Sequence, residues 1–172
     1  IEESFVRLGI PYAVFGGMRF YERREIKDVL AYLRIIANPR DEEALARIIN
    51  TPSRGIGPKS LAQLQTYARA KGKPTLEAME AALALGLLKN PGARGAQDFL
   101  RQLSQIKDRG QGQVSDLMQA VLDITGLEAE LKAEIDGEDR LTNIRELIAS
   151  AEGTSDLMRY LEEKALITGT DM

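Results

Sequence analysis

The sequence predicts an all-α protein, an irregular bundle of about nine helices with helix-hairpin-helix-like units. Two observations support this fold class. Apolar residues recur at spacings of three and four along nearly the whole chain, and glycine and proline clusters divide it into segments of helix length. With 44% apolar and 28% charged residues in a chain of 172, the composition is typical of a globular domain with its own core. Because tryptophan is absent and aromatic residues are few, this core should be aliphatic.

The first sixteen residues contain the single strand candidate, the apolar run "IPYAVFGG", which ends at Gly16 and Gly17. A lone strand cannot form a sheet. It is therefore either an irregular edge or a piece of a neighbouring domain. The chain begins without methionine and within a helical pattern, so we expect the second.

Helical spacing begins at about Glu22 and continues to Asn38-Pro39, where a helix must end. Three acidic residues at positions 41–43 then open a second helix, where the helix dipole favours them. The remaining apolar patterns predict helices over 41–50, 58–71, 75–88, a segment through Phe99 and Ile106, 114–125, 127–135, 141–151 and 157–167.

The composition excludes several classes of function. The chain has no cysteine, so disulfides, thiolate metal sites and cysteine nucleophiles are ruled out. It also has no histidine, the central residue of most acid–base and catalytic zinc sites. We therefore predict no catalytic residues and no metal site. The longest uncharged apolar run, residues 81–88, is too short to span a bilayer.

The net charge of −3 hides an asymmetry between the two parts of the chain. Residues 1–75 have a balance of +5 and residues 76–172 a balance of −8. Basic residues suited to nucleic acid are thus concentrated in the first part. The alternative is that these charges only solvate helix faces.

The stretch "TPSRGIGPKS", residues 51–60, joins two predicted helices by a short, basic turn. Its two glycines allow positive φ values and let a ligand approach the backbone, while Pro58 is suited to the first position of a helix. Ile56 can anchor the turn between the helices. The amides of Gly55, Gly57 and the residues after Pro58 would then face outwards, with the helix dipole behind them, and form an anion site.

Charged and hydroxyl side chains around the turn suit a phosphodiester backbone, which is contacted without reading base sequence. They are Thr51, Ser53, Arg54, Lys59 and Ser60. The alternative is a glycine-ended helix followed by a proline-started one. At "NPGARGAQ", Arg94 with Gly92 and Gly95 predicts a second, weaker contact, for which a plain loop is an equal alternative.

The stretch "IPYAVFGGMRFYERREIKDVLAYLRIIANPRDEEALARIINTPSRGIGPKSL" resembles superfamily 1 DNA helicases of the UvrD/PcrA/Rep type. The similar segment runs from subdomain 2A into the inserted subdomain 2B. The resemblance is dense over residues 1–68 and looser afterwards, at "RLTNIRELIASA" and "LMRYLEEKALITGTDM". It implies that residues 1–16 are a remnant of 2A and that residues 17–172 form 2B.

In that family the GIG turn contacts the duplex ahead of the fork. The resemblance therefore implies double-stranded DNA binding by Thr51, Arg54, Gly55, Ile56, Gly57, Lys59 and Ser60. Weaker contacts are expected from Arg23, Arg24 and Lys27, for which a solvated or interdomain face is an equal alternative. Gly16 and Gly17 would lie at the 2A–2B hinge.

The parent protein implied by the resemblance is a bacterial, cytoplasmic and nucleoid-associated enzyme that uses ATP and magnesium to unwind DNA in the 3′ to 5′ direction. No G-x-x-x-x-G-K-[ST] motif occurs here, so we expect no enzymatic activity and no cofactor in this chain alone. Expected partners are the duplex, the other helicase subdomains and DNA repair proteins, but no membrane. The rival hypothesis is a protein-interaction or autoinhibitory module that uses the acidic residues 76–172.

Overall fold

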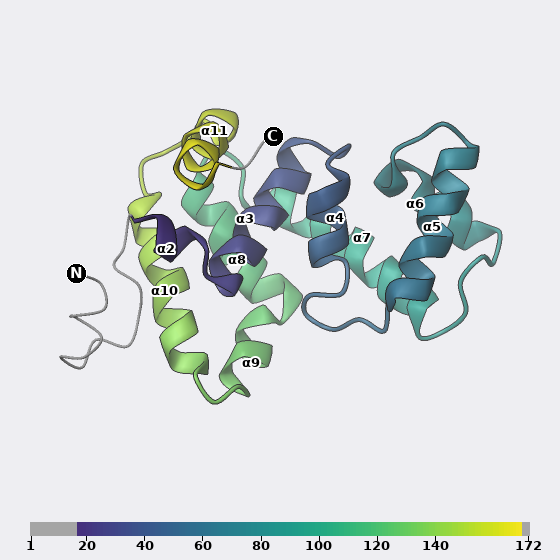
Figure 1. Cartoon of the computed structure of the whole chain (residues 1–172), viewed down its shortest axis with the longest axis horizontal. Coiled ribbons are helices and arrows are strands. Elements are labelled where there is room, and N and C mark those ends of the chain that lie inside the picture. The colour runs from purple at the N-terminus through teal and green to yellow at the C-terminus, as the bar shows by residue number, and fades with distance from the viewer. Residues whose placement is uncertain (1–16, 170–172) are drawn as a thin grey trace.

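The computed structural model describes residues 17–169, which form ten helices and contain no strand (Figure 1). The predicted all-α class is confirmed for this part of the chain. The strand candidate, Gly16 and the proposed 2A remnant at residues 1–16 lie outside the described residues. None of the helices in residues 17–169 has the length and apolar character needed to cross a membrane.

The first part of the fold is built around one buried helix. Its sequence buries Ile26, Val29 and Leu33 completely, as the helical spacing predicts. The following helix begins at Asp41, whose carboxylate accepts the Ala44 amide at 3.0 Å and so caps the helix. The helices of this part are α2 (Met18–Tyr21), α3 (Arg24–Ala37) and α4 (Glu42–Ile48).

Three helices form the other end of the molecule. They are α5 (Pro58–Ala70), α6 (Thr75–Ala84) and α7 (Gly92–Arg109). Helices α5 and α6 pack against each other, and α7, about 27 Å long, connects them to the rest of the fold (Figure 1). Because α4 packs mainly on α3, and α5 on α6, the two helices that flank the GIG sequence have different packing partners.

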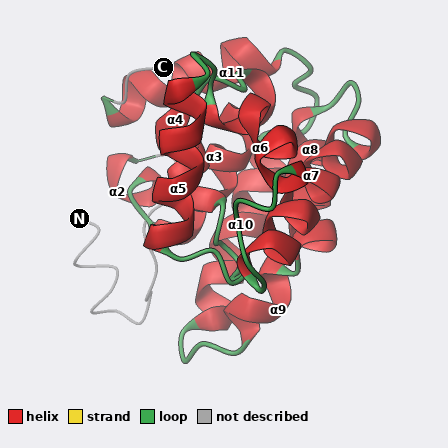
Figure 2. Cartoon of the chain, turned by 90° about the vertical axis from the view of Figure 1, so that its right-hand side faces the viewer, coloured by secondary structure: helices red, strands yellow, loops and turns green. Residues whose placement is uncertain are grey.

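The last four helices complete the larger part of the core. They are α8 (Val114–Thr125), α9 (Leu127–Lys132), α10 (Gly137–Ser150) and α11 (Leu157–Thr168). Helix α10 packs against α3, α8 and α9, and α11 covers α2 and α3. Figure 2 shows the helices joined only by loops.

The structure differs from the predicted helices at three places. Helix α2 precedes the predicted start at Glu22, and α6 ends at Ala84 rather than Leu88, before Gly86 with φ 71°. Helix α10 begins at Gly137 rather than Leu141. Here "DGED" opens the helix instead of separating two, because acidic residues in a first turn interact favourably with the helix dipole.

Candidate nucleic-acid interface

Residues 49–57, named here the GIG loop, connect α4 to α5 and are held in shape by Asn50. The Asn50 side-chain oxygen accepts hydrogen bonds from the amides of Arg54 at 2.6 Å and Ile56 at 3.1 Å. The Ile56 side chain is 2% exposed and belongs to the hydrophobic core. Two contacts therefore fix the centre of the loop: the hydrogen bonds to the Asn50 side chain and the burial of the Ile56 side chain in the core.

Arg54 supports this loop from within the fold. Its Nη2 atom donates to the Tyr32 hydroxyl at 2.6 Å and to Gln102 Oε1 at 2.8 Å, and its Nε also reaches Gln102. The guanidinium carbon lies 5.0 Å from the centre of the Phe99 ring. Nη1 donates to the carbonyls of Ile48, Ile49, Thr51 and Pro52. Every nitrogen of this guanidinium thus has an acceptor in the fold, so Arg54 has no donor left for a phosphate.

Tyr32 and Thr51 belong to the same support. Burial raises the pKa of the Tyr32 phenol above its usual value, although the nearby Arg54 opposes this rise. The phenol is therefore protonated at neutral pH, and it donates to the Thr51 carbonyl. The Thr51 hydroxyl donates to the Arg47 carbonyl at 3.2 Å. Thr51, like Arg54, has its polar groups engaged with the protein.

The two glycines of the GIG loop have different roles. Gly55 has φ 79°, and a Cβ atom there would lie 2.9 Å from Pro91 side-chain carbons. Gly57 is extended, with φ −80° and ψ −179°, and a Cβ there would meet nothing within 4 Å. Gly55 is therefore needed by the fold, whereas Gly57 leaves open space beside the backbone.

The start of α5 presents amides without partners. Among residues 17–169, no hydrogen-bond acceptor is within reach of the amides of Gly55, Gly57, Lys59 and Ser60. Gly57 is the N-cap residue and has no side chain that could cap the helix. The positive end of the dipole of this thirteen-residue helix lies at the same place. These groups together can bind an anion.

Residues 85–91, named here the support loop, connect α6 to α7 and lie against the GIG loop. A Cβ at Gly95 would lie 2.0 Å from the Arg54 carbonyl oxygen, and one at Gly92 would lie 3.2 Å from Ser60 Oγ. These two glycines of the predicted second contact therefore allow the first turn of α7 to pack against the GIG loop. Their role is close approach within the fold.

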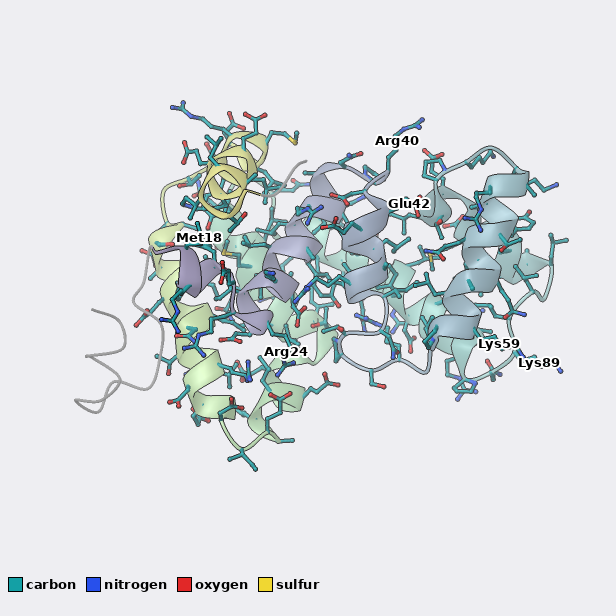
Figure 3. The ribbon with its side chains drawn as sticks, viewed as in Figure 1. Met18, Arg24, Arg40, Glu42, Lys59 and Lys89 are labelled. Carbon is teal, nitrogen blue, oxygen red and sulfur yellow. The ribbon has the colours of Figure 1, made fainter. Side chains whose placement is uncertain are left out.

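Three exposed cations surround the two loops. Lys59, Lys89 and Arg94 have no ion-pair partner within the described part of the chain. Lys59 and Lys89 lie at the same end of the molecule (Figure 3). Sequence reasoning missed Lys89, because an isolated lysine before Asn-Pro has no distinctive pattern, and only the packing of the two loops brings it near Lys59.

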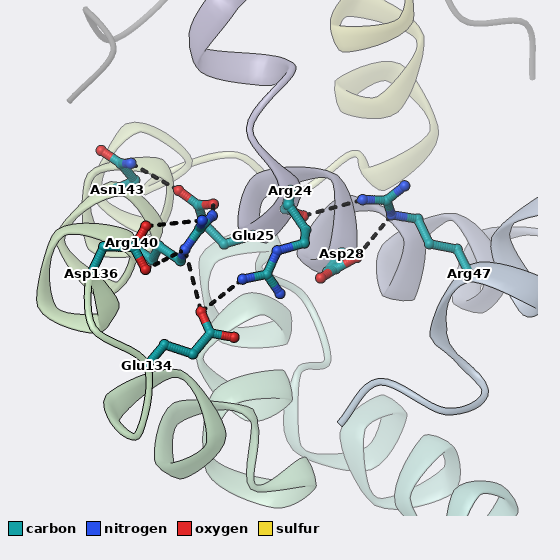
Figure 4. Close-up of polar contacts among 8 residues, drawn as sticks. All are labelled: Arg24, Glu25, Asp28, Arg47, Glu134, Asp136, Arg140 and Asn143. Atoms are coloured by element: carbon teal, nitrogen blue, oxygen red, sulfur yellow. Dashed lines mark hydrogen bonds and ion pairs between the residues drawn. The ribbon is translucent and has the colours of Figure 1, made fainter. Parts of the chain in front are cut away.

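The three basic residues at the start of α3 differ in whether they pair with other residues of the fold. Arg24 pairs with Glu134 at 2.7 Å, and its carbonyl accepts from Arg47 (Figure 4). Arg24 is therefore part of a polar network between α3, α4 and the α9–α10 region. Arg23 and Lys27 have no such partner among residues 17–169 and remain available for a contact.

The predicted hinge is described only in part, because Gly17 alone lies within the structure. Gly17 is the N-cap of α2, and its carbonyl accepts the amide of Phe20 at 3.1 Å. Residues 17–169 contain no group of three acidic side chains arranged to hold a metal ion.

Comparisons with known proteins bear on these observations. The UvrD-like helicase C-terminal domain family matches residues 1–73. The ATP-dependent DNA helicase UvrD1 of Mycobacterium tuberculosis is 39% identical over 155 residues, which cover 88% of this chain and 20% of that protein. The ATP-dependent DNA helicase PcrA of Bacillus subtilis is 35% identical over 181 residues, covering 99% of this chain and 24% of that protein.

The resemblance inferred from the sequence is thereby confirmed. PcrA of Staphylococcus epidermidis gives a similar result, with 36% identity over 97% of this chain. Over most of its length the chain corresponds to a segment of the UvrD/PcrA-type helicases. It spans about a fifth to a quarter of the length of the curated relatives that it matches.

Proposed function

We propose that residues 17–172 are the 2B subdomain of a UvrD/PcrA-type helicase and bind duplex DNA without sequence preference. The observation that carries this proposal is a set of four amides around the start of α5 that make no hydrogen bond within residues 17–169, next to three exposed cations without an ion pair in the same part of the chain. Backbone amides and lysines match phosphate oxygens and carry no information about bases. In the parent protein, rotation of this subdomain would regulate an ATP- and magnesium-dependent 3′ to 5′ helicase in the bacterial cytoplasm.

The proposed contact set differs from the sequence prediction in two respects: it adds Lys89 and omits the side chains of Arg54 and Thr51. It contains the amides of Gly55, Gly57, Lys59 and Ser60 and the side chains of Lys59, Lys89 and Arg94, with Ile56 as the anchor. Arg54 and Thr51 support the loop, because their donors are used within the fold. Arg23 and Lys27 are secondary contacts in this proposal.

The test is a salt titration of duplex binding with the chain and a lysine-pair variant. With few neutralised phosphates, the dissociation constant should lie near the non-specific range of about 10⁻⁴ to 10⁻⁶ M. Lys59→Ala combined with Lys89→Ala should weaken binding and reduce the slope of log K against log salt by about 2. Lys107→Ala is the control for a lysine outside the proposed contact, because Lys107 lies near the other end of α7.

The rival function is a protein-interaction or autoinhibitory module that uses the acidic second part of the chain. One observation favours it. The segment 127–140 carries Glu128, Glu130, Glu134, Asp136, Glu138 and Asp139, against only two basic residues. If the lysine-pair variant and the control bind the duplex equally, the DNA-binding proposal fails and this rival function takes its place.

A further inference from the structure

A carboxylate occupies one more amide of the GIG loop. The Ser53 amide donates to Oε2 of Glu130 on α9, at 2.9 Å. The two residues are 77 positions apart in the chain, and both are exposed to solvent. An exposed carboxylate on a backbone amide has the same chemistry as a phosphate oxygen bound to that amide.

The charge of Glu130 is not compensated by a neighbouring cation. No lysine or arginine pairs with it in residues 17–169, whereas Glu128 on the same helix pairs with Lys132 at 3.2 Å. Glu134, just beyond α9, pairs with Arg24 and Arg140. Glu130 is therefore an acidic residue of this region that contacts the GIG loop and has no lysine or arginine paired with it within residues 17–169.

We infer that the phosphate-binding surface extends to the Ser53 amide and that Glu130 limits its affinity for DNA. This inference rests on the proposed function. Glu130 acts in two ways: it occupies an amide that a phosphate oxygen would otherwise accept from, and its charge repels the phosphates bound nearby. Ser53 is two residues before Gly55, so a backbone bound at the start of α5 can reach both amides.

The size of the effect follows from the Coulomb interaction of two exposed charges. At the separation of neighbouring groups in water, removing one repulsive charge should tighten binding about threefold to tenfold at low salt. The gain should shrink as the salt concentration rises, because exposed charges are screened beyond about 10 Å at 0.1 M. A strong salt dependence of the gain therefore distinguishes charge repulsion from a change in shape.

The experiment compares Glu130→Gln with Glu128→Gln in duplex binding at low and moderate salt. Glutamine keeps the side-chain oxygen that accepts the Ser53 amide and removes only the charge. Glu128→Gln makes the same charge change on the same helix, away from this contact. We expect Glu130→Gln to tighten binding severalfold and Glu128→Gln to change it less than about twofold.

A second variant and a second measurement keep the test independent of folding. Glu130→Ala also frees the amide, so the Ser53 amide proton should exchange faster in the free variant and slow down when duplex is added. Equal affinity of Glu130→Gln and the unmodified chain, with unfolding transitions unchanged, would overturn the inference. If the lysine-pair variant still lost affinity in that case, the proposed function would stand without this extension.

Discussion

The GIG loop and the support loop are alike in construction and different in what they leave exposed. In each, an asparagine side chain accepts the amide of the arginine four residues later: Asn50 for Arg54 and Asn90 for Arg94. In the GIG loop the arginine points inwards and the next helix begins with vacant amides. Beside the support loop the arginine is exposed, and the amides of Ala93, Arg94 and Gly95 all have acceptors.

This comparison shows how a loop can be both rigid and available to a ligand. The GIG loop satisfies its inner amides through Asn50 and its carbonyls through Arg54, so its outer amides can stay vacant without loosening the loop. The first turn of α7 packs against it, and the amides of Ala93, Arg94 and Gly95 in that turn have acceptors. One loop thus presents the binding groups, and its neighbour holds it in place.

The largest expected change in the free energy of unfolding distinguishes Arg54 from Arg94. Arg54→Ala should lower the free energy of unfolding by about 3 kcal/mol, because four carbonyls and two side-chain partners would lose a half-buried cation. Arg94→Ala, the matched control, should change it by less than about 0.5 kcal/mol. Chemical denaturation measures both. Equal losses would show that the two arginines are not used differently.

The second largest change in stability is expected between alanine substitutions at two glycines, Gly95 and Gly57. Gly95→Ala places a Cβ at 2.0 Å from the Arg54 carbonyl, so the two loops must move apart, at a cost of about 2 kcal/mol. Gly57→Ala meets open space and should cost about 0.5 kcal/mol, mainly through its poorer capping preference. The measurement is the midpoint and slope of urea unfolding. A stable Gly95→Ala protein would contradict the close packing of the loops.

The third change in stability is expected on replacing the loop asparagines Asn50 and Asn90. Asn50→Ala leaves two amides without their acceptor and should destabilise the protein by about 1.5 kcal/mol. Asn90→Ala removes one acceptor and should cost about half as much. Hydrogen exchange of the Ile56 amide provides a local measurement. It should accelerate in Asn50→Ala and stay unchanged in Asn90→Ala.

The sequence predicted most helices well, because the spacing of apolar residues and the position of helix-starting residues can be read within one segment of the chain. Spacing identified the buried face of α3 through Ile26, Val29 and Leu33, and Pro58 marked the first residue of α5. The start of α10 was missed because "DGED" can both break a helix and begin one, and in the structure two of its acidic residues lie in the first turn of α10, where the helix dipole favours them.

The part of the candidate site that consists of backbone amides could be predicted from the sequence, whereas the roles of its side chains could not. A glycine-flanked turn before Pro58 indicated the vacant amides from the sequence alone. The direction of Arg54 could not be read there, because its partners Tyr32 and Gln102 lie 22 and 48 positions away in the chain. The same reason hid Lys89 and the contact between Glu130 and Ser53. Charge near a motif is visible in a sequence, whereas the partner of that charge depends on tertiary packing.

The smallest expected change in stability gives the most direct test of the vacant amides. Gly57 has the extended backbone of an N-cap residue, so an aspartate there can accept the amides that are free in the present structure. Gly57→Asp should therefore raise the free energy of unfolding by a few tenths of a kcal/mol. At the same time it should weaken duplex binding severalfold, because its carboxylate takes the position proposed for the phosphate and adds a repulsive charge.

The matched control places the same change at another helix start. Gln113 is the N-cap of α8 and makes no capping hydrogen bond, so Gln113→Asp adds one negative charge and one cap far from the two loops. It should stabilise the protein by a similar amount and leave duplex affinity within about twofold. If Gly57→Asp stabilised the helix but bound DNA as tightly as Gln113→Asp, the amides at the start of α5 would not be the phosphate contact. The difference between the GIG loop and the support loop would then concern folding alone.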